Sequence, residues 1–240
     1  QGPAMLVNGY TVSRLSDQRI KQICELIETA TAISQWPAEF FEIEDNIRRR
    51  DLLLADETTA DSPDGRALRA LVENGSDALL DVIEQSGLRG RGGAGFRTAM
   101  KWRFCKQAEA DSHYVVCNAD EGEPGTFKDR VLLNSYADGV FEGMTLCAGI
   151  IGAQQGYLYL RGEYRYLLEP LQAELQQRRD NGLLGQGILG KDGFDFDIDI
   201  HLGAGAYICG EESSLIESLE GKRGIPRKRP PFPVTHGYLN

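Results

Sequence analysis

The chain has 240 residues, with 26 basic and 36 acidic side chains and a formal net charge of −10. This length suits one large domain, or one domain and part of another, and the negative charge disfavours nucleic acid as a partner. No apolar run has the length of a membrane span, and the opening residues do not have the pattern of a signal peptide. The five cysteines contain no C-x-x-C pair, so we expect reduced thiols, a cytoplasmic location and no membrane insertion.

The first residues predict a hairpin followed by one helix. Asn8-Gly9 stands between two apolar-rich runs, which is typical of a tight hairpin, and Ser16 is a suitable helix N-cap. Four side chains share one face of the expected helix: Ile20, Ile23, Cys24 and Ile27. Because a hairpin and one helix cannot bury a core of their own, we expect residues 1–30 to be the end of a domain that begins upstream of Gln1.

The next stretch, residues 31–65, is polar and irregular, with an arginine run at 48–50 and the acidic, turn-like sequence DETTADSPDG. We expect a linker or a connector that runs along the surface, in which the three arginines form a solvated face.

From residue 66 to 240, apolar periodicity alternates between helix and strand. The expected helices cover residues 67–86, 98–110, 137–154, 164–181 and 211–219. The expected strands cover residues 114–117, 157–160 and 194–201. This alternation predicts an α/β layered domain.

The glycine-rich segment LRGRGGAGFRTAMK, Leu88–Lys101, predicts a ligand loop ahead of a helix. Backbone N–H groups at glycines approach a ligand closely and form an anion-binding cradle. Gly90, Gly92 and Gly95 satisfy G-x-G-x-x-G, but that dinucleotide fingerprint follows a strand. The pattern before this loop is helical and ends at Gly87. We therefore predict helix–loop–helix rather than a Rossmann turn or a flexible linker.

The acidic segment NADEGEPGTFKDR, Asn118–Arg130, directly follows the expected strand YVVC. Ligands of α/β folds bind beyond the carboxyl ends of strands. Asp120, Glu121 and Glu123 would repel phosphate, but they would accept hydrogen bonds from ribose hydroxyls, a carboxamide or a flavin ring N–H. A divalent metal site ranks lower because the D-x-D-x-D-G spacing is missing. A plain acidic surface turn is the third interpretation.

The segment GAGAYICGEES, Gly203–Ser213, repeats the order of strand, glycine loop and helix start. Helix capping explains Glu211 and Glu212, because the N-terminal dipole favours negative charge. Capping does not explain Tyr207 and Cys209 in so tight a loop.

The basic, proline-rich segment GKRGIPRKRPPFP, Gly221–Pro233, is typical of a solvated stretch. Its cations could also meet a dinucleotide phosphate or an acidic neighbouring subunit, and Phe232 could offer a stacking face.

Together, RGRGGAGF, NADEGEPGTFKDR, GAYICGEE, SLEGKRG and PPFP resemble the flavin-bearing, NADH-binding subunit of respiratory complex I and its soluble relatives. The relatives include the diaphorase subunits of NAD-reducing [NiFe] hydrogenase and of NAD-dependent formate dehydrogenase. YLRGEY, GFDFDI and FPVTHGYLN resemble the hydrogenase diaphorase most. The opening hairpin and helix resemble the tail of the thioredoxin-like [2Fe-2S] domain that precedes the flavin domain there.

The resemblance implies an incomplete FMN/NADH-binding domain at 66–240, and it implies a role for each matched residue. The flavin floor would be Gly90, Gly92 and Gly93, and Lys101 would reach the FMN phosphate. The polar edge of the isoalloxazine ring and the ribityl chain would be held by Asn118, Asp120 and Glu121. The opposite wall would be Tyr207, Gly210 and Glu211. NADH would be positioned by Phe96, Glu123, Glu212 and Phe232.

The implied reaction is reversible hydride transfer between nicotinamide C4 and flavin N5, in which no side chain acts as general acid or base. Electrons would pass to or from iron–sulfur clusters. The [4Fe-4S] and [2Fe-2S] ligands, and an asparagine-rich flavin motif, are expected only in segments outside this chain, and Cys209 is not expected to be a cluster ligand. The expected partners are NAD(H) and the iron–sulfur and hydrogenase subunits of a hetero-oligomer. The alternatives are the corresponding subunit of formate dehydrogenase or complex I, a non-catalytic docking module, or a metal-dependent hydrolase.

Overall fold

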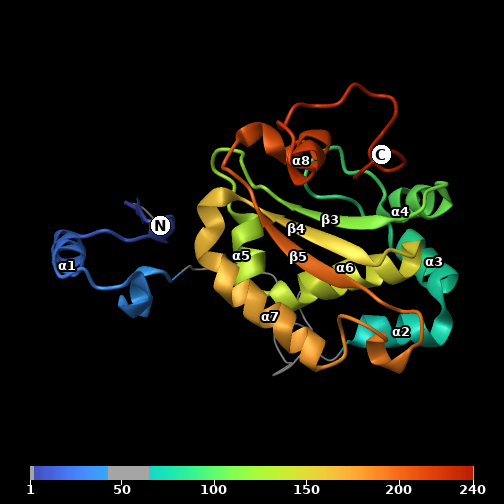
Figure 1. Cartoon of the computed structure of the whole chain (residues 1–240), viewed down its shortest axis with the longest axis horizontal. Coiled ribbons are helices and arrows are strands. Elements are labelled where there is room, and N and C mark those ends of the chain that lie inside the picture. The colour runs from blue at the N-terminus through green and yellow to red at the C-terminus, as the bar shows by residue number, and fades with distance from the viewer. Residues whose placement is uncertain (1–2, 43–64, 240) are drawn as a thin grey trace.

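A three-stranded parallel sheet organises the later part of the chain (Figure 1). The structure is a computed structural model that describes residues 3–42 and 65–239. In order across the sheet, the strands are β3 (Tyr114–Ala119), β4 (Gln155–Leu160) and β5 (Asp197–Leu202). The register places Ala119 opposite Leu160, and Leu160 opposite Leu202. The carboxyl ends of all three strands therefore lie level at one edge.

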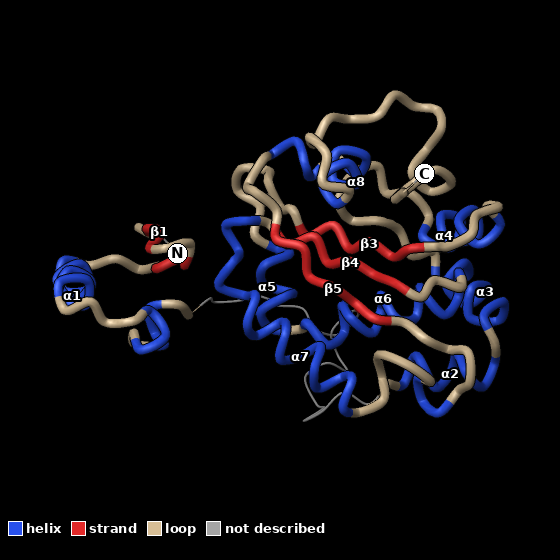
Figure 2. The backbone as a smooth tube through the Cα atoms, in the orientation of Figure 1, coloured by secondary structure: helices blue, strands red, loops and turns tan. Residues whose placement is uncertain are grey.

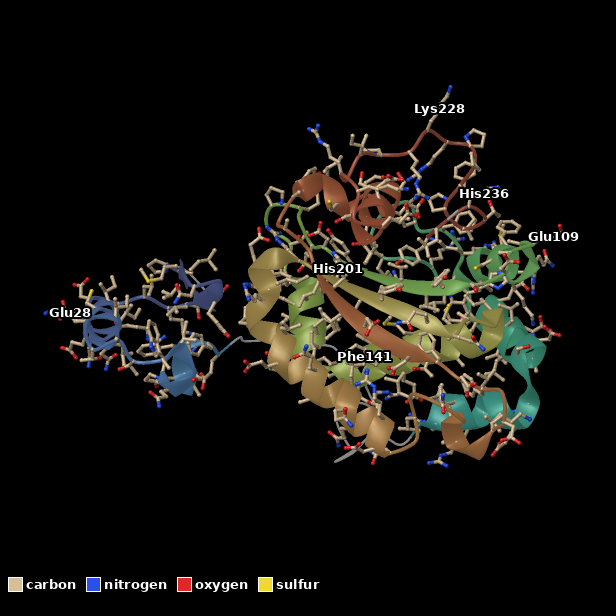
Figure 3. All side chains as sticks on the ribbon, in the orientation of Figure 1. Glu28, Glu109, Phe141, His201, Lys228 and His236 are labelled. Atoms are coloured by element: carbon tan, nitrogen blue, oxygen red, sulfur yellow. The ribbon has the colours of Figure 1, made fainter. Side chains whose placement is uncertain are left out.

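Helices cover both faces of this sheet (Figure 2). One face packs against α6 (Ala137–Ile151) and α7 (Leu168–Asp180). The helices packed around α6 are α2 (Arg66–Asn74), α3 (Ser76–Ser86), α4 (Thr98–Gln107) and α5 (Lys128–Ser135). The opposite face holds α8 (Glu212–Leu219). Phe141, Leu158 and Ile198 are buried between the sheet and the first face, where Figure 3 labels Phe141.

The structure confirms a mixed α/β fold with a parallel sheet, and it corrects several element boundaries. Gly75, at φ 85°, separates α2 from α3, so residues 67–86 form two helices rather than one. The helix α5 starts inside the stretch expected to be loop. A 3-10 helix, Gly162–Leu167, replaces the first turn of the helix expected from residue 164, because the backbone at Tyr164 leaves helical geometry. None of the described helices is long and apolar enough to cross a membrane.

The opening hairpin and helix are also confirmed. β1 (Met5–Val7) and β2 (Tyr10–Val12) pair antiparallel through a turn at Asn8 and Gly9, whose φ angles are 51° and 85°. The helix α1 (Asp17–Glu28) begins at Ser16, whose Oγ accepts a hydrogen bond from the N–H of Arg19 at 3.2 Å.

A small core belongs to this opening segment. Its buried members are Val12, Ile23, Trp36 and Phe40. Trp36 and Phe40 come from the stretch expected to be a linker. Trp36 follows the 3-10 helix Ile33–Gln35, and Phe40 ends the 3-10 helix Ala38–Phe40. On the predicted apolar face of α1, Ile20 and Ile27 are exposed and only Ile23 is buried. The arginine run at 48–50 and the acidic stretch after it lie outside the described residues.

Two glycines of α6 offer a matched test of how tightly the core is packed. A Cβ at Gly149 would lie 2.4 Å from Leu71 Cδ2 and 2.9 Å from the ring of Phe194, whereas a Cβ at Gly143 would meet nothing within 4 Å. We expect Gly149→Ala to lower the free energy of unfolding by about 1–3 kcal/mol through overpacking. We expect Gly143→Ala to raise it by about 0.5–1 kcal/mol, because alanine is the better helix former. Urea unfolding measures both, and shifts of the same sign would contradict this packing.

Candidate functional site

Three loops meet at the carboxyl edge of the sheet. They are the glycine-rich loop between α3 and α4, the acidic loop after β3, and the loop after β5, which contains the 3-10 helix Tyr207–Gly210. The basic segment after α8 adds a fourth wall. Two adjoining cavities of about 920 and 640 Å³ lie between these walls, and both touch Gly92, Asn118, Gly210 and Glu211.

Every predicted site residue lines one or both of these cavities. The larger cavity touches Gly90, Gly92, Gly93, Phe96, Lys101, Asn118, Gly210, Glu211, Glu212 and Phe232. The smaller cavity adds Asp120, Glu121, Glu123 and Tyr207. Segments far apart in the sequence thus lie together beyond the carboxyl ends of the strands, where α/β folds bind their ligands.

The predicted helix–loop–helix around the glycine-rich loop is confirmed. α3 ends at Gly87, which adopts the left-handed conformation at φ 68°. The loop closes on itself through a hydrogen bond from the N–H of Gly90 to the carbonyl of Phe96, at 2.9 Å. A Cβ at Gly92 or Gly93 would meet nothing within 4 Å. The loop therefore presents open backbone surface, against which a flat ligand can lie.

Half-exposed aromatic rings mark the larger cavity. Phe96, Phe104 and Phe232 are 49%, 42% and 53% exposed, and the first two rings lie 6.5 Å apart. Large exposed rings gathered in a cavity offer stacking faces to a planar ligand. Sequence reasoning missed Phe104; its place two turns along the helix that follows the loop was the available signal.

Two cations hold the carboxylates at the start of α8. Glu212 Oε2 lies 3.2 Å from Lys101 Nζ, and Glu212 Oε1 lies 3.2 Å from Arg229 Nη2. Arg229 also pairs with Glu211. Both cations are partly exposed, so each pair contributes little to stability and can exchange for a ligand. Sequence reasoning named Arg229 only among the basic-segment cations that could meet a dinucleotide phosphate, and not among the cofactor-binding residues.

The predicted capping role of Glu211 is confirmed. Its Oε2 accepts hydrogen bonds from the N–H groups of Ser213 and Ser214, both at 3.0 Å. Burial acts to raise the pKa of Glu211, but hydrogen bonds from the Ser213 hydroxyl and from these two N–H groups, together with Arg229, outweigh it and lower the pKa. In contrast, none of the described side chains caps the start of α4.

The three carboxylates of the acidic loop have different surroundings. Glu121 is buried, and it accepts hydrogen bonds from Tyr164 Oη at 2.9 Å and from the N–H of Asp129 in α5 at 3.1 Å. Glu123 accepts one from Tyr207 Oη at 2.6 Å, across the smaller cavity. Both thus have partners within the chain.

Asp120 is the exception in this loop. Its Oδ2 is buried and has no hydrogen-bond partner among the described residues. The pKa of Asp120 is raised, mainly by burial. The positive charge of Arg161 opposes this rise, and the negative charge of Glu163 adds to it. The neighbouring Asn118 is held in place, because its Nδ2 donates to the carbonyl of Gly210 at 2.8 Å. A ligand that donates an N–H or O–H would satisfy the free oxygen of Asp120.

Comparison with known proteins identifies the family of the chain. The Nuo51 FMN-binding domain matches residues 83–240. The chain belongs to this family.

Within the described residues, no group of three or more His, Cys, Asp or Glu side chains could hold a metal ion.

Two relatives and one solved structure show how far the similarity extends. The chain is 47% identical to the NAD-reducing hydrogenase HoxS subunit alpha of Cupriavidus necator, over 100% of this chain and 41% of that protein. It is 51% identical to the F 2 subunit of NADH-quinone oxidoreductase of Rhizobium meliloti, over 72% of this chain and 41% of that protein. A structure of NAD+-reducing [NiFe]-hydrogenase in the H2-reduced state matches with a TM-score of 0.86 and 47% identity, over 100% of this chain and 40% of that one. The chain therefore spans about two fifths of the length of these relatives.

The raised pKa of Asp120 has a consequence for stability. The folded chain binds this proton more tightly than the unfolded chain does, so the ionised carboxylate destabilises the fold once the pH exceeds the ordinary value of 3.8. We expect Asp120→Asn to be more stable than the parent at pH 7, with a difference that shrinks as the pH falls towards 4. Thermal midpoints between pH 4 and 8 measure this, and a variant less stable at pH 7 would mean that a partner satisfies the carboxylate in the free protein.

Proposed function

We propose that this chain forms much of the flavin and dinucleotide site of a diaphorase subunit in an NAD-reducing hydrogenase. The reaction is reversible hydride transfer between NAD(H) and FMN, with electrons passing to or from iron–sulfur clusters held elsewhere. The observation that carries the proposal is the combination, in adjoining cavities, of open glycine backbone, three exposed rings and one buried, unpartnered carboxylate oxygen.

The residues present fit FMN. The free oxygen of Asp120 suits an N–H donor of the isoalloxazine ring or a ribityl hydroxyl, and the open surface at Gly92 and Gly93 suits the flat ring. The phosphate suits the uncapped start of α4, beside Lys101, because Glu211 already closes the start of α8. When bound, FMN supplies the hydride chemistry, and the chain supplies binding and orientation. Glu121 also lines the smaller cavity, and because Tyr164 and the start of α5 already hold its carboxylate, we expect it mainly to brace this wall.

The dinucleotide is expected against the aromatic rings of the larger cavity. Phe96, Phe104 and Phe232 offer stacking faces. Glu123 can accept a hydrogen bond from a ribose hydroxyl or the nicotinamide carboxamide once Tyr207 releases it. Glu212 can do the same once Lys101 or Arg229 releases it. The same carboxylates would repel an added 2′-phosphate, which favours NAD over NADP.

The wider assembly is also a proposal. We infer that residues 1–30 are the tail of a thioredoxin-like [2Fe-2S] domain, against which Trp36 and Phe40 also pack. The rest of 31–65 is a connector, and 66–240 is the FMN/NADH-binding domain. The exposed side chains Ile20 and Ile27 support the first part, because a domain that begins upstream would cover them. The match to hydrogenase chains supports a hetero-oligomer with hydrogenase and iron–sulfur subunits, for which we propose a cytoplasmic location.

The corresponding complex I subunit is the second candidate, favoured by 51% identity to the NADH-quinone oxidoreductase relative. That similarity covers 72% of this chain, whereas the hydrogenase relative is similar along 100% of it, so the opening segment favours the hydrogenase.

The first test is the visible spectrum of the full-length protein in its native assembly, before and after NADH. We expect a flavin band that NADH bleaches. An assembly that holds no flavin even after FMN is added would reject the proposal and favour a docking module.

A pair of phenylalanines tests the stacking role. Phe232→Ala is expected to raise the KM for NADH about tenfold, because an aromatic stacking contact contributes about 0.5–1.5 kcal/mol beyond its buried area. Phe127→Ala is the control, since Phe127 is 45% exposed but lines neither cavity. Steady-state kinetics measures both, and equal effects would argue against stacking on Phe232.

A further inference from the structure

The segment after α8, residues 221–239, forms one wall of the larger cavity without a helix or strand of its own. Four of its side chains line that cavity: Arg229, Phe232, Val234 and Thr235. Its outermost part carries Lys228, which points into solvent (Figure 3). Ordering a loop of this kind loses much conformational entropy. The contacts that hold the two ends of this loop together therefore determine the position of Phe232.

The carboxylate of Glu220 closes this segment. Its side chain is only 2% exposed, and it accepts hydrogen bonds from Lys222 Nζ at 2.6 Å, Arg227 Nη2 at 2.8 Å and the N–H of Leu239 at 2.8 Å. These donors come from the start, the middle and the end of the segment. Burial acts to raise the pKa of Glu220, but the three hydrogen bonds outweigh it and lower the pKa. One ionised, buried carboxylate thus joins both ends of the loop.

Arg227 extends this closure in two directions. Its Nε donates to Glu217 Oε1 at 2.5 Å, and its main-chain N–H donates to Ser213 Oγ at 2.9 Å, so it fastens the segment to α8. Its Nη1 donates to the carbonyl of Gly237 at 2.7 Å, which fastens the far end. Nearby, Tyr238 packs edge-on against the sheet residue Tyr114, with the ring centroids 4.9 Å apart. The cavity residues of the segment lie between these fastened points.

We propose that Glu220 is a positioning residue for the dinucleotide, which acts through Arg227 to hold Phe232 in place before the ligand arrives. The proposal rests on the function proposed above. Glu220 lines neither cavity, so its effect is transmitted through the segment. A preformed wall spares the ligand the entropy of ordering it. Loss of the closure therefore weakens dinucleotide binding more than it slows the bound complex.

Glu220→Gln tests this in the full-length protein. The amide has the same size, but its NH2 group would face the donors of Lys222 or Arg227. We expect the KM for NADH to rise about tenfold, with kcat and flavin content within about a factor of two of the parent. We also expect trypsin to cut within residues 222–229 about tenfold faster, because the loop opens more often. Glu73→Gln is the control, since it removes the same charge from an exposed position on α2.

A second variant guards against an effect particular to glutamine. Arg227→Lys keeps the charge, but one ammonium group cannot span Glu217, Glu220 and Gly237. This variant should therefore also raise the KM for NADH and speed up the proteolysis.

Faster proteolysis with an unchanged KM would overturn the positioning role. A joint fall of kcat and flavin content in both variants would also overturn it, in favour of a general structural role. If the parent holds no flavin and oxidises no NADH, the proposed function fails and the role towards the dinucleotide fails with it, whereas the proteolysis still reports whether Glu220 closes the segment.

Discussion

The walls of the cavities depend on how Arg161 ties the strand ends together. Arg161 follows β4, and its guanidinium donates to the main-chain oxygen of Glu121 in the acidic loop. Its own N–H donates to the carbonyl of Ala119 at 3.1 Å, at the end of β3. The next residue, Gly162, has no side chain, and a Cβ there would lie 2.6 Å from the carbonyl of Gly203 beyond β5. The segments that follow β3, β4 and β5 can therefore lie close together at one level, with these backbone groups paired.

This close arrangement divides the acidic residues into two groups. Glu121 and Glu211 are paired with N–H groups at helix starts, so they fix the walls. Asp120 has a free buried oxygen, and Glu212 has only partly exposed cations as partners. A buried acceptor without a donor and an exchangeable ion pair are both unfavourable or weak in the free protein. A polar ligand can satisfy such groups, so Asp120 and Glu212 are better candidates for ligand contact than Glu121 and Glu211 are.

Much of the fold followed from local sequence patterns, whereas the different roles of the acidic residues did not. Asn8-Gly9, Ser16 and Gly87 act over a few residues, and the structure has the turn, the cap and the helix end where the sequence places them. The partners of Glu121 and Glu220 lie up to 43 residues away, so one carboxylate in an acidic run cannot be told from another before the chain is folded. The apolar face of α1 shows the same limit, because periodicity finds a face but not what covers it.

The glycine motif does not by itself decide which fold carries it. In a Rossmann turn, the helix that follows the glycines continues from a strand of the sheet, and the phosphate lies beyond that strand. Here the loop joins α3 to α4, which pack against α6, and it approaches the carboxyl edge from beside the sheet. The space beyond β3 and β5 is left to Asn118, Asp120 and Gly210, which suit the donors of a ring and a sugar-like chain. The glycines thus leave open backbone at the cavity, and the element before them decides from which side that backbone approaches the edge of the sheet.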